Sequence, residues 1–166
     1  MGVSTRWLDE RQLAAWVRLA AVMELLPAAL DSQLRRDAGL THFEYFCLAM
    51  LSDAPERTLR MTALGRRTNA TLPRLSHVVR KLEERGFVER FPCPQDARAV
   101  NARLTPAGWD KVVATAPGHV AKVRDLVVDA LAPEQLDRLA EACEAMLAKL
   151  DPEGSMTPVY HRHDPA

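Results

Sequence analysis

The sequence predicts a mainly α-helical fold with one small β-hairpin, in which a compact middle section lies between long terminal helices. Three observations support this. Apolar residues recur with the 3.6-residue period of a helix through most of the 166 residues. In the middle, two helical stretches are separated by a turn of only three or four residues. After Gly86 the helical period gives way to a short pattern that is typical of strands.

The first helix is expected over residues 9–38, closed by Gly39, because glycine readily adopts the left-handed conformation that ends many helices. Its apolar band is wider than a single core needs and comprises Leu13, Trp16, Val17, Ala20, Val22, Met23, Leu26, Leu30 and Leu34. A second helix begins at Thr41, since Thr41 and Glu44 have the spacing of a capping box.

A short helix around residues 60–67 and a longer one capped by Asn69 or Thr71 have the helix-turn-helix layout. The longer helix carries a buried-face stripe made of Leu75, Val78, Val79 and Leu82. Residues 87–91 then predict a strand, residues 92–99 a turn, and residues 100–104 a returning strand. A β-hairpin therefore follows directly behind a helix.

Thr105 and Pro106 are a strong helix start, and we expect that helix to be interrupted at Pro117-Gly118. Pro133 begins the last helix, with an apolar stripe from Leu136 to Leu150. From Asp151 onward no periodicity is present, which predicts a mobile tail.

The net charge of zero conceals a segregation of charge. Residues 57–103 contain eleven Lys and Arg but only four Asp and Glu, so this window carries +7 and the remainder −7. A basic middle between acidic arms favours a module that binds a polyanion. The alternative is that these charges are only solvated helix faces.

The charge order along the basic helix argues for the first interpretation. Arg74 lies in the first turn and Glu83 and Glu84 near the end, although the helix dipole favours the reverse. The penalty is only ~0.3–1 kcal/mol. A helix whose N-terminus points at phosphates gains from cations there, because they act together with the free backbone N–H groups.

Three motifs in the middle of the chain carry a family resemblance. They are KLEERGFVER at 81–90, DARA at 96–99 and LTPAG at 104–108, in the order basic helix, hairpin and following helix. This arrangement resembles the winged helix-turn-helix of the MarR (multiple-antibiotic-resistance regulator) family of transcriptional regulators, over roughly residues 9–150. The resemblance implies a regulator, most simply a repressor, that binds double-stranded DNA and is not an enzyme.

The resemblance also implies which residues contact DNA. Arg98 matches the arginine at the tip of the wing, which enters a minor groove, and Asp96 matches the acid that steadies the wing, by holding a basic side chain. Bases would be read from the first two turns of the basic helix, which offer Thr71, Pro73, Arg74, Ser76 and His77, whereas phosphates would be held by Arg80 and Lys81. His77 stands where many members have arginine.

The long terminal helices imply a homodimer, because in the family such helices intertwine with those of a second chain, and two copies would read a palindromic operator. The expected organisation is a dimerisation helix at 1–40, a winged helix-turn-helix at 41–105, dimerisation helices at 106–150 and the tail at 151–166. Members of the family often bind a small aromatic or phenolic effector. Residues on three helices that would line such a site are Trp16, His42, Phe46, Trp109 and His119.

Other classes of function find less support. No catalytic or nucleotide-binding motif is present, the cysteines lack zinc spacing, and His161-x-His163 alone is weak, so we expect neither enzyme activity nor a cofactor or metal. No apolar run approaches the ~18 residues of a membrane span, and the start lacks the layout of a secretory signal, so a cytoplasmic protein without a membrane partner is expected. Two alternatives remain open. One is a redox-sensing regulator of the same fold that uses Cys93, which is expected in an exposed turn; the other is an interaction module that has lost DNA binding.

Overall fold

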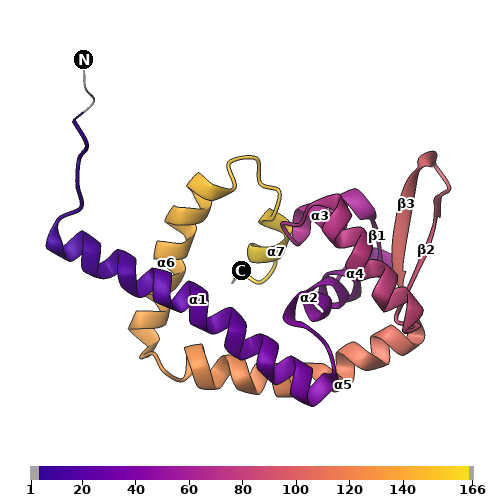
Figure 1. Cartoon of the computed structure of the whole chain (residues 1–166), viewed down its shortest axis with the longest axis horizontal. Coiled ribbons are helices and arrows are strands. Elements are labelled where there is room, and N and C mark those ends of the chain that lie inside the picture. The colour runs from indigo at the N-terminus through magenta and orange to yellow at the C-terminus, as the bar shows by residue number, and fades with distance from the viewer. Residues whose placement is uncertain (1–3, 165–166) are drawn as a thin grey trace.

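The structure is a computed structural model that describes residues 4–164, and it is mainly helical with one three-stranded antiparallel sheet (Figure 1). The predicted fold class is confirmed. The elements in chain order are α1 (Glu10–Ala38), α2 (His42–Ser52), the 3-10 turn η1 (Pro55–Arg57), β1 (Thr58–Arg60), α3 (Met61–Arg67), α4 (Leu72–Glu84), β2 (Val88–Cys93), β3 (Asp96–Leu104), α5 (Pro106–Val123), the π-helical turn η2 (Arg124–Val128), α6 (Pro133–Leu150) and α7 (Thr157–Tyr160).

A single hydrophobic core holds α2, α3, α4 and the sheet together as one lobe. Leu48 and Leu51 of α2, Leu64 of α3, and Leu75 and Leu82 of α4 are completely buried in it. The capping box predicted at the start of α2 is present, because the Thr41 hydroxyl accepts from the Glu44 backbone N–H and the Glu44 carboxylate accepts from the Thr41 N–H. The burial of Leu75 and Leu82 anchors α4, the basic helix of the sequence analysis, by its apolar face.

The sheet differs from the sequence prediction in two ways. A first strand, β1, was not predicted; it pairs with β3, which therefore lies between β1 and β2. The strands of the hairpin also extend beyond their predicted limits, with Cys93 paired to Asp96, so the predicted turn at 92–99 was too long. Pro92 is tolerated within β2 because β2 is an edge strand, and the pairing register shifts between Pro92 and Cys93.

The base of the hairpin is locked to the start of α5. The Thr105 backbone N–H donates to the Phe87 carbonyl, the Thr105 hydroxyl donates to the Gly86 carbonyl, and the same hydroxyl accepts from the Gly108 N–H. A Cβ on Gly108 would lie 2.0 Å from the Phe87 carbonyl oxygen. Only glycine fits this position.

The terminal helices α1, α5 and α6 form a stem that extends away from the lobe (Figure 1). α1 buries Leu30, Gln33 and Leu34 near its C-terminal end, where it packs on α2 and α5. The predicted interruption at Pro117-Gly118 was wrong, since α5 continues to Val123. A proline removes only one helical hydrogen bond, and the packing of α5 against α1 outweighs that loss.

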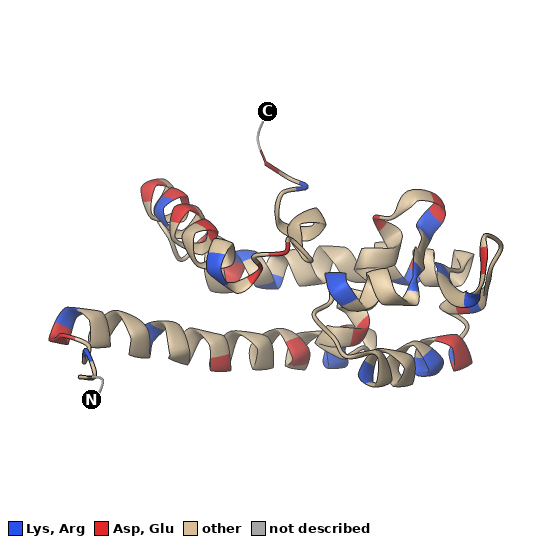
Figure 2. Cartoon of the chain, turned by 90° about the horizontal axis from the view of Figure 1, so that it is seen from above, with Lys and Arg blue, Asp and Glu red and all other residues tan. Residues whose placement is uncertain are grey.

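Most of the stem's apolar surface is exposed. Leu13, Trp16 and Met23 of α1 are each about half exposed, and α6 contributes no buried residue. Contrary to the sequence expectation, α1 is by length and composition apolar enough to cross a membrane, and little of that stretch is buried. Figure 2 shows few charged residues along its middle. An exposed apolar surface of this kind is typical of an interaction site.

The last residues have more local structure than the predicted mobile tail implies. Residues 157–160 form α7, and the Arg162 guanidinium lies 3.0 Å from the Asp53 carboxylate at the end of α2. The segment therefore returns to the lobe.

We predict that Gly108→Ala lowers the free energy of unfolding by about 1–3 kcal/mol or more, because the new methyl group overlaps a backbone carbonyl. Chemical denaturation at a fixed protein concentration measures this. Gly118→Ala is the matched control, since its Cβ would lie 3.5 Å from the nearest atom, Gln33 Nε2, and the change should stay within about 1 kcal/mol. Equal stability of the two variants would contradict the packing described above.

Candidate nucleic-acid interface

The first two turns of α4 present polar and basic side chains to solvent. Leu75 and Val79 point into the core, so the opposite face of the helix must face outward. Thr71 is the N-cap residue, but its hydroxyl makes no capping hydrogen bond and remains available. The residues that the sequence placed here are all exposed: Thr71, Pro73, Arg74, Ser76, His77, Arg80 and Lys81.

Arg74 is held by an aromatic ring. Its guanidinium carbon lies 4.2 Å from the centroid of the Phe43 ring on α2. Such a contact contributes ~0.5–1 kcal/mol at an exposed site. Moving the Arg74 guanidinium away from the Phe43 ring would cost about that much.

Further along the helix, three side chains form a surface chain. Nδ1 of His77 lies 3.1 Å from an Arg80 Nη2 atom, and the Arg80 guanidinium lies 3.9 Å from the Glu84 carboxylate. Lys81 has no carboxylate partner among residues 4–164. Within the described part of the chain, Lys81 is thus free of ion pairs, while Arg80 is weakly restrained.

The hairpin turn is steadied by Asp96. One Asp96 oxygen accepts from the Arg98 backbone N–H at 3.1 Å, and the other lies 3.8 Å from the Arg60 guanidinium on β1. Asp96 thus lies beside a basic side chain, as the resemblance implies. The Arg98 side chain is exposed and has no ion-pair partner within the described residues.

A crevice of about 250 Å³ separates α4 from the hairpin. It brings Ser76 and Arg98 to the same place, together with Arg60 and Thr62, which the sequence analysis did not single out. Both lie at the start of α3, where free backbone N–H groups favour anions. A signal for them existed, because Arg60 falls inside the basic window at the start of the short helix predicted around residues 60–67. The complete lining is Arg60, Met61, Thr62, Leu72, Ser76, Arg90, Arg98, Ala99 and Val100.

Several other cations of the basic window serve the fold. Arg90 donates to the Glu83 carboxylate through Nε and Nη2, at 3.0 and 2.7 Å, and ties β2 to the end of α4. These hydrogen bonds hold the pKa of Glu83 below its usual value. Arg103 pairs with Glu89 across the two strands of the hairpin. The excess of positive charge therefore divides into paired and free cations.

The structure places the five residues proposed for an effector site in different surroundings. His42 and His119 lie near each other, with ring centroids 6.2 Å apart, and the His119 ring lies 4.8 Å from that of Tyr45. Trp109 instead carries the Arg57 guanidinium on its face, and Trp16 lies on the exposed part of α1. Phe46 is half-buried on α2.

The histidine pair leaves polar atoms without partners. Burial lowers the pKa of His42 and of His119, which favours the neutral form of both imidazoles. Among residues 4–164, the buried Nδ1 of His119 has no hydrogen-bond partner, and neither has Oε1 of Gln33, a residue that is 3% exposed. Unpaired buried polar atoms are costly and indicate a place for a water or a ligand. Tyr45 and Gln33 were missed because nothing in their sequence context marks them as polar neighbours of a histidine.

The cysteines are arranged as buried or partly buried thiols. Cys47 lies in the core, and burial raises its pKa to about 12. Cys93 was expected to be exposed but is 4% exposed, since β2 extends to include it. The pKa of the Cys93 thiol is lowered, mainly by a hydrogen bond with the Gln95 backbone and then by the nearby Arg60 guanidinium. Among residues 4–164, no cluster of three or more His, Cys, Asp or Glu side chains is placed to hold a metal ion.

A family model and two similar solved structures all point to the same protein family. The model of the MarR family matches residues 40–100. Sco3205 of Streptomyces coelicolor, a MarR family transcriptional regulator solved in complex with DNA, is 41% identical, with a TM-score of 0.87 over 91% of this chain and 94% of that one. AbsC of the same organism, also a MarR family regulator, is 36% identical, with a TM-score of 0.84 over 88% and 98% of the two chains.

A similarity to curated sequences points the same way. The transcriptional repressor YetL of Bacillus subtilis is 27% identical over 112 residues, which cover 68% of this chain and 66% of YetL. The chain spans about half to two thirds of the length of the curated relatives it matches. These relatives are regulators and not enzymes. The lobe, the hairpin and the two close structures together show that the chain belongs to the MarR family of transcriptional regulators.

Proposed function

We propose that this chain is a sequence-specific repressor that binds a palindromic operator in double-stranded DNA as a homodimer. The observation that carries the proposal is the pairing of the exposed N-terminal turns of α4 with Arg98 across one crevice. A solved complex of the similar Sco3205 with DNA supports it, as does the name repressor given to YetL. A protein that reads the chromosome acts in the bacterial cytoplasm, which is the compartment we propose.

The position of a residue along α4 decides whether it would contact bases or phosphates. Thr71, Pro73, Arg74, Ser76 and His77 occupy the turns that would enter a major groove and face base edges. Arg80 and Lys81 lie farther back, where phosphates would pass. Arg74 leaves Phe43 on binding, and a bidentate contact with guanine, worth ~1–3 kcal/mol, exceeds the cost of that move.

The hairpin acts as a wing. Asp96 and Arg60 fix its turn, and Arg98 enters the adjacent minor groove, whose potential is most negative in narrow A·T-rich stretches. A free arginine is suited to this because no internal carboxylate must be given up.

The homodimer follows from the exposed stem. Leu13, Trp16 and Met23 of α1 and Leu136 and Leu139 of α6 are 37–52% exposed. A second copy of the stem would cover this surface. Two α4 helices related by a twofold axis would reach successive major grooves about 34–36 Å apart. A dimer also accounts for the apolar length of α1 without a membrane partner.

We further propose that a small aromatic or phenolic effector releases the DNA. The specific observation is the group formed by His42, Tyr45 and His119, where α1, α2 and α5 meet and where His119 Nδ1 and Gln33 Oε1 have no partner. This junction joins the stem to the lobe, so a ligand wedged there would change the spacing of the two α4 helices.

Arg98→Ala should weaken binding to a duplex selected from a random pool by the parent protein, by about tenfold, and reduce the salt slope by about one. Fluorescence anisotropy over a salt series measures both values. Arg103→Ala is the matched control, because Arg103 lies on the same strand but is already paired with Glu89. Equal losses for the two variants, or none for Arg98→Ala, would contradict the assignment of the wing tip.

Leu139→Asp should convert the dimer into monomers at about micromolar concentration, because it places a charge on the apolar face of α6. Light scattering gives the mass directly. Arg138→Asp puts the same carboxylate on the neighbouring, exposed position and should leave the dimer intact. A stable monomer of the parent protein at that concentration would rule out the dimer.

Phenolic acids should quench or shift tryptophan fluorescence and lower affinity for the selected duplex. His119→Leu should weaken that binding about tenfold, since it removes the unpaired ring nitrogen. His163→Leu, an exposed change in the C-terminal segment, serves as the control. No response from the parent protein across a broad panel would exclude this class of effector.

A further inference from the structure

The C-terminal segment, residues 151–164, returns from the end of α6 to the lobe and lies beside α3 (Figure 1). Its far end is fastened to α2. One Arg162 Nη1 atom donates to the Asp53 carbonyl at 3.0 Å and lies 3.0 Å from the Asp53 carboxylate. The segment is therefore attached at both ends, by the helix that precedes it and by Arg162.

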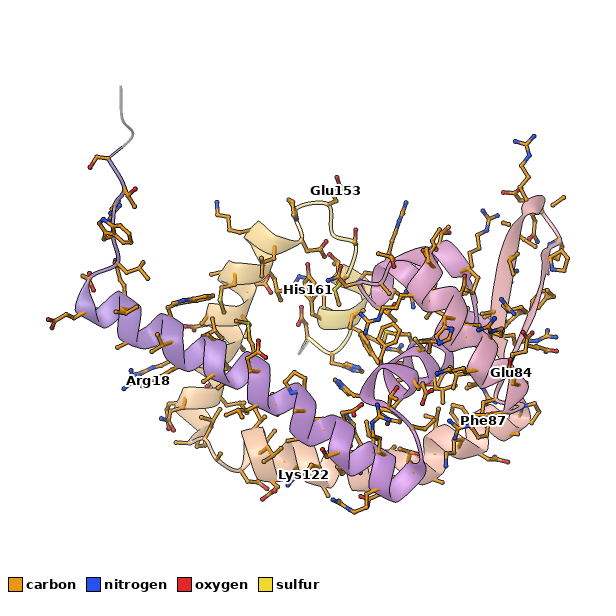
Figure 3. All side chains as sticks on the ribbon, viewed as in Figure 1. Arg18, Glu84, Phe87, Lys122, Glu153 and His161 are labelled. Carbon is orange, nitrogen blue, oxygen red and sulfur yellow. The ribbon has the colours of Figure 1, made fainter. Side chains whose placement is uncertain are left out.

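Between these attachments the segment has its own hydrogen bonds. The Asp151 carboxylate accepts from the backbone N–H groups of Ser155 and Met156, at 2.7 and 2.8 Å. It also accepts from the Tyr160 hydroxyl at 3.3 Å. These bonds close a turn that places Glu153 at the outer edge of the loop, as Figure 3 shows. The shape of the segment is thus set locally, mainly by Asp151.

The segment and the helix-turn-helix form the two walls of a groove. A hollow of about 950 Å³ is lined on one side by Thr62, Arg66 and Thr71, among others, and on the other by the end of α6 with Asp151 and Glu153. A second hollow lies between Glu153 to Ser155 and the cations of α3, Arg66 and Arg67. Within residues 4–164, neither of these two arginines has an ion-pair partner.

The charges on the two walls are opposite. Residues 151–164 contain three acids, Asp151, Glu153 and Asp164, against one base, Arg162. Asp164 lies 2.6 Å from His161 and raises the pKa of that imidazole, so the carboxylates that line the groove are those of Asp151 and Glu153. The facing edge of α3 carries free arginines and leads to the N-terminus of α4. A DNA phosphate that approached Arg66 and Arg67 would enter the hollow that Glu153 also lines. Exposed charges interact over a Debye length of about 8–10 Å, so the carboxylate and the phosphate would repel each other there.

We propose that residues 151–164 are an acidic cover on the α3 edge of the interface, which competes with DNA phosphates and lowers the affinity of the whole chain for duplex DNA. This inference rests on the proposed function, because it assumes that the lobe binds DNA. The cover opens when phosphates displace Glu153 from the neighbourhood of Arg66 and Arg67. The cover thus changes the affinity for duplex DNA but makes no contact with the bases that α4 reads.

A chain that ends at Leu150 tests the cover. Binding to a labelled duplex of about 30 base pairs, long enough for two half-sites one helical turn apart, is measured by anisotropy in dilute and in physiological salt. The truncated chain should bind about threefold to tenfold more tightly, the scale of one or two surface charge interactions, and the gain should shrink with added salt. Light scattering and thermal unfolding check that the dimer and the fold are retained.

Two point variants keep the test decisive if truncation disturbs folding. Arg162→Ala releases the attachment to Asp53, and Glu153→Gln removes the outermost charge; each should raise affinity in the same direction. Glu134→Gln, at the exposed start of α6, is the matched control and should bind as the parent does.

The outcomes separate this inference from the proposed function. If the parent binds duplex DNA and the truncated chain binds equally well or more weakly, the cover is refuted while the function stands. If Glu153→Gln and Glu134→Gln have equal effects, a specific cover is refuted as well. If neither the parent nor the truncated chain binds any duplex, the proposed function fails, and the cover fails with it.

Discussion

Burial of Leu75, Val79 and Leu82 in the core of the lobe is the interaction on which the rest of the structure depends. Each fully buried aliphatic side chain contributes roughly 1.5–3 kcal/mol. The unfavourable placement of Arg74 near the helix start costs only ~0.3–1 kcal/mol. The apolar stripe therefore decides how α4 is rotated, and the cations on its other face point outward as a consequence.

The positive charge of the middle section has two separate uses. Arg90 and Arg103 are paired with Glu83 and Glu89 and hold the hairpin to α4 and to itself. Lys81 and Arg98 are exposed and have no carboxylate partner among the described residues. If every cation were in an ion pair, none would be free to bind a phosphate. If no cation were paired, the hairpin would lose the ion pairs that hold it rigid. The division lets one helix and one strand stay fixed while their tips remain available.

Much of this could be predicted from the sequence, because the deciding patterns are local. The spacing of Thr41 and Glu44 predicts the capping box of α2. Gly39 predicts the end of α1, and Gly86 marks the change from helix to strand. What could not be predicted depends on contacts between distant residues. β1 exists only because it pairs with β3, α5 passes Pro117 because it packs on α1, and Cys93 is buried because β2 is longer than its prolines suggest. The stacking of Arg74 on Phe43 and the meeting of His42 with His119 likewise join separate helices.

In the proposed complex, the exposed cations of α4 and of the wing lie against the phosphates of duplex DNA, in two copies. The salt dependence of duplex binding tests it most directly. If a dimer makes about 6–10 phosphate contacts, affinity should fall by roughly 10³–10⁵ between about 50 and 200 mM salt. Affinity that is independent of salt, or no binding to any duplex even in dilute buffer, would contradict the account.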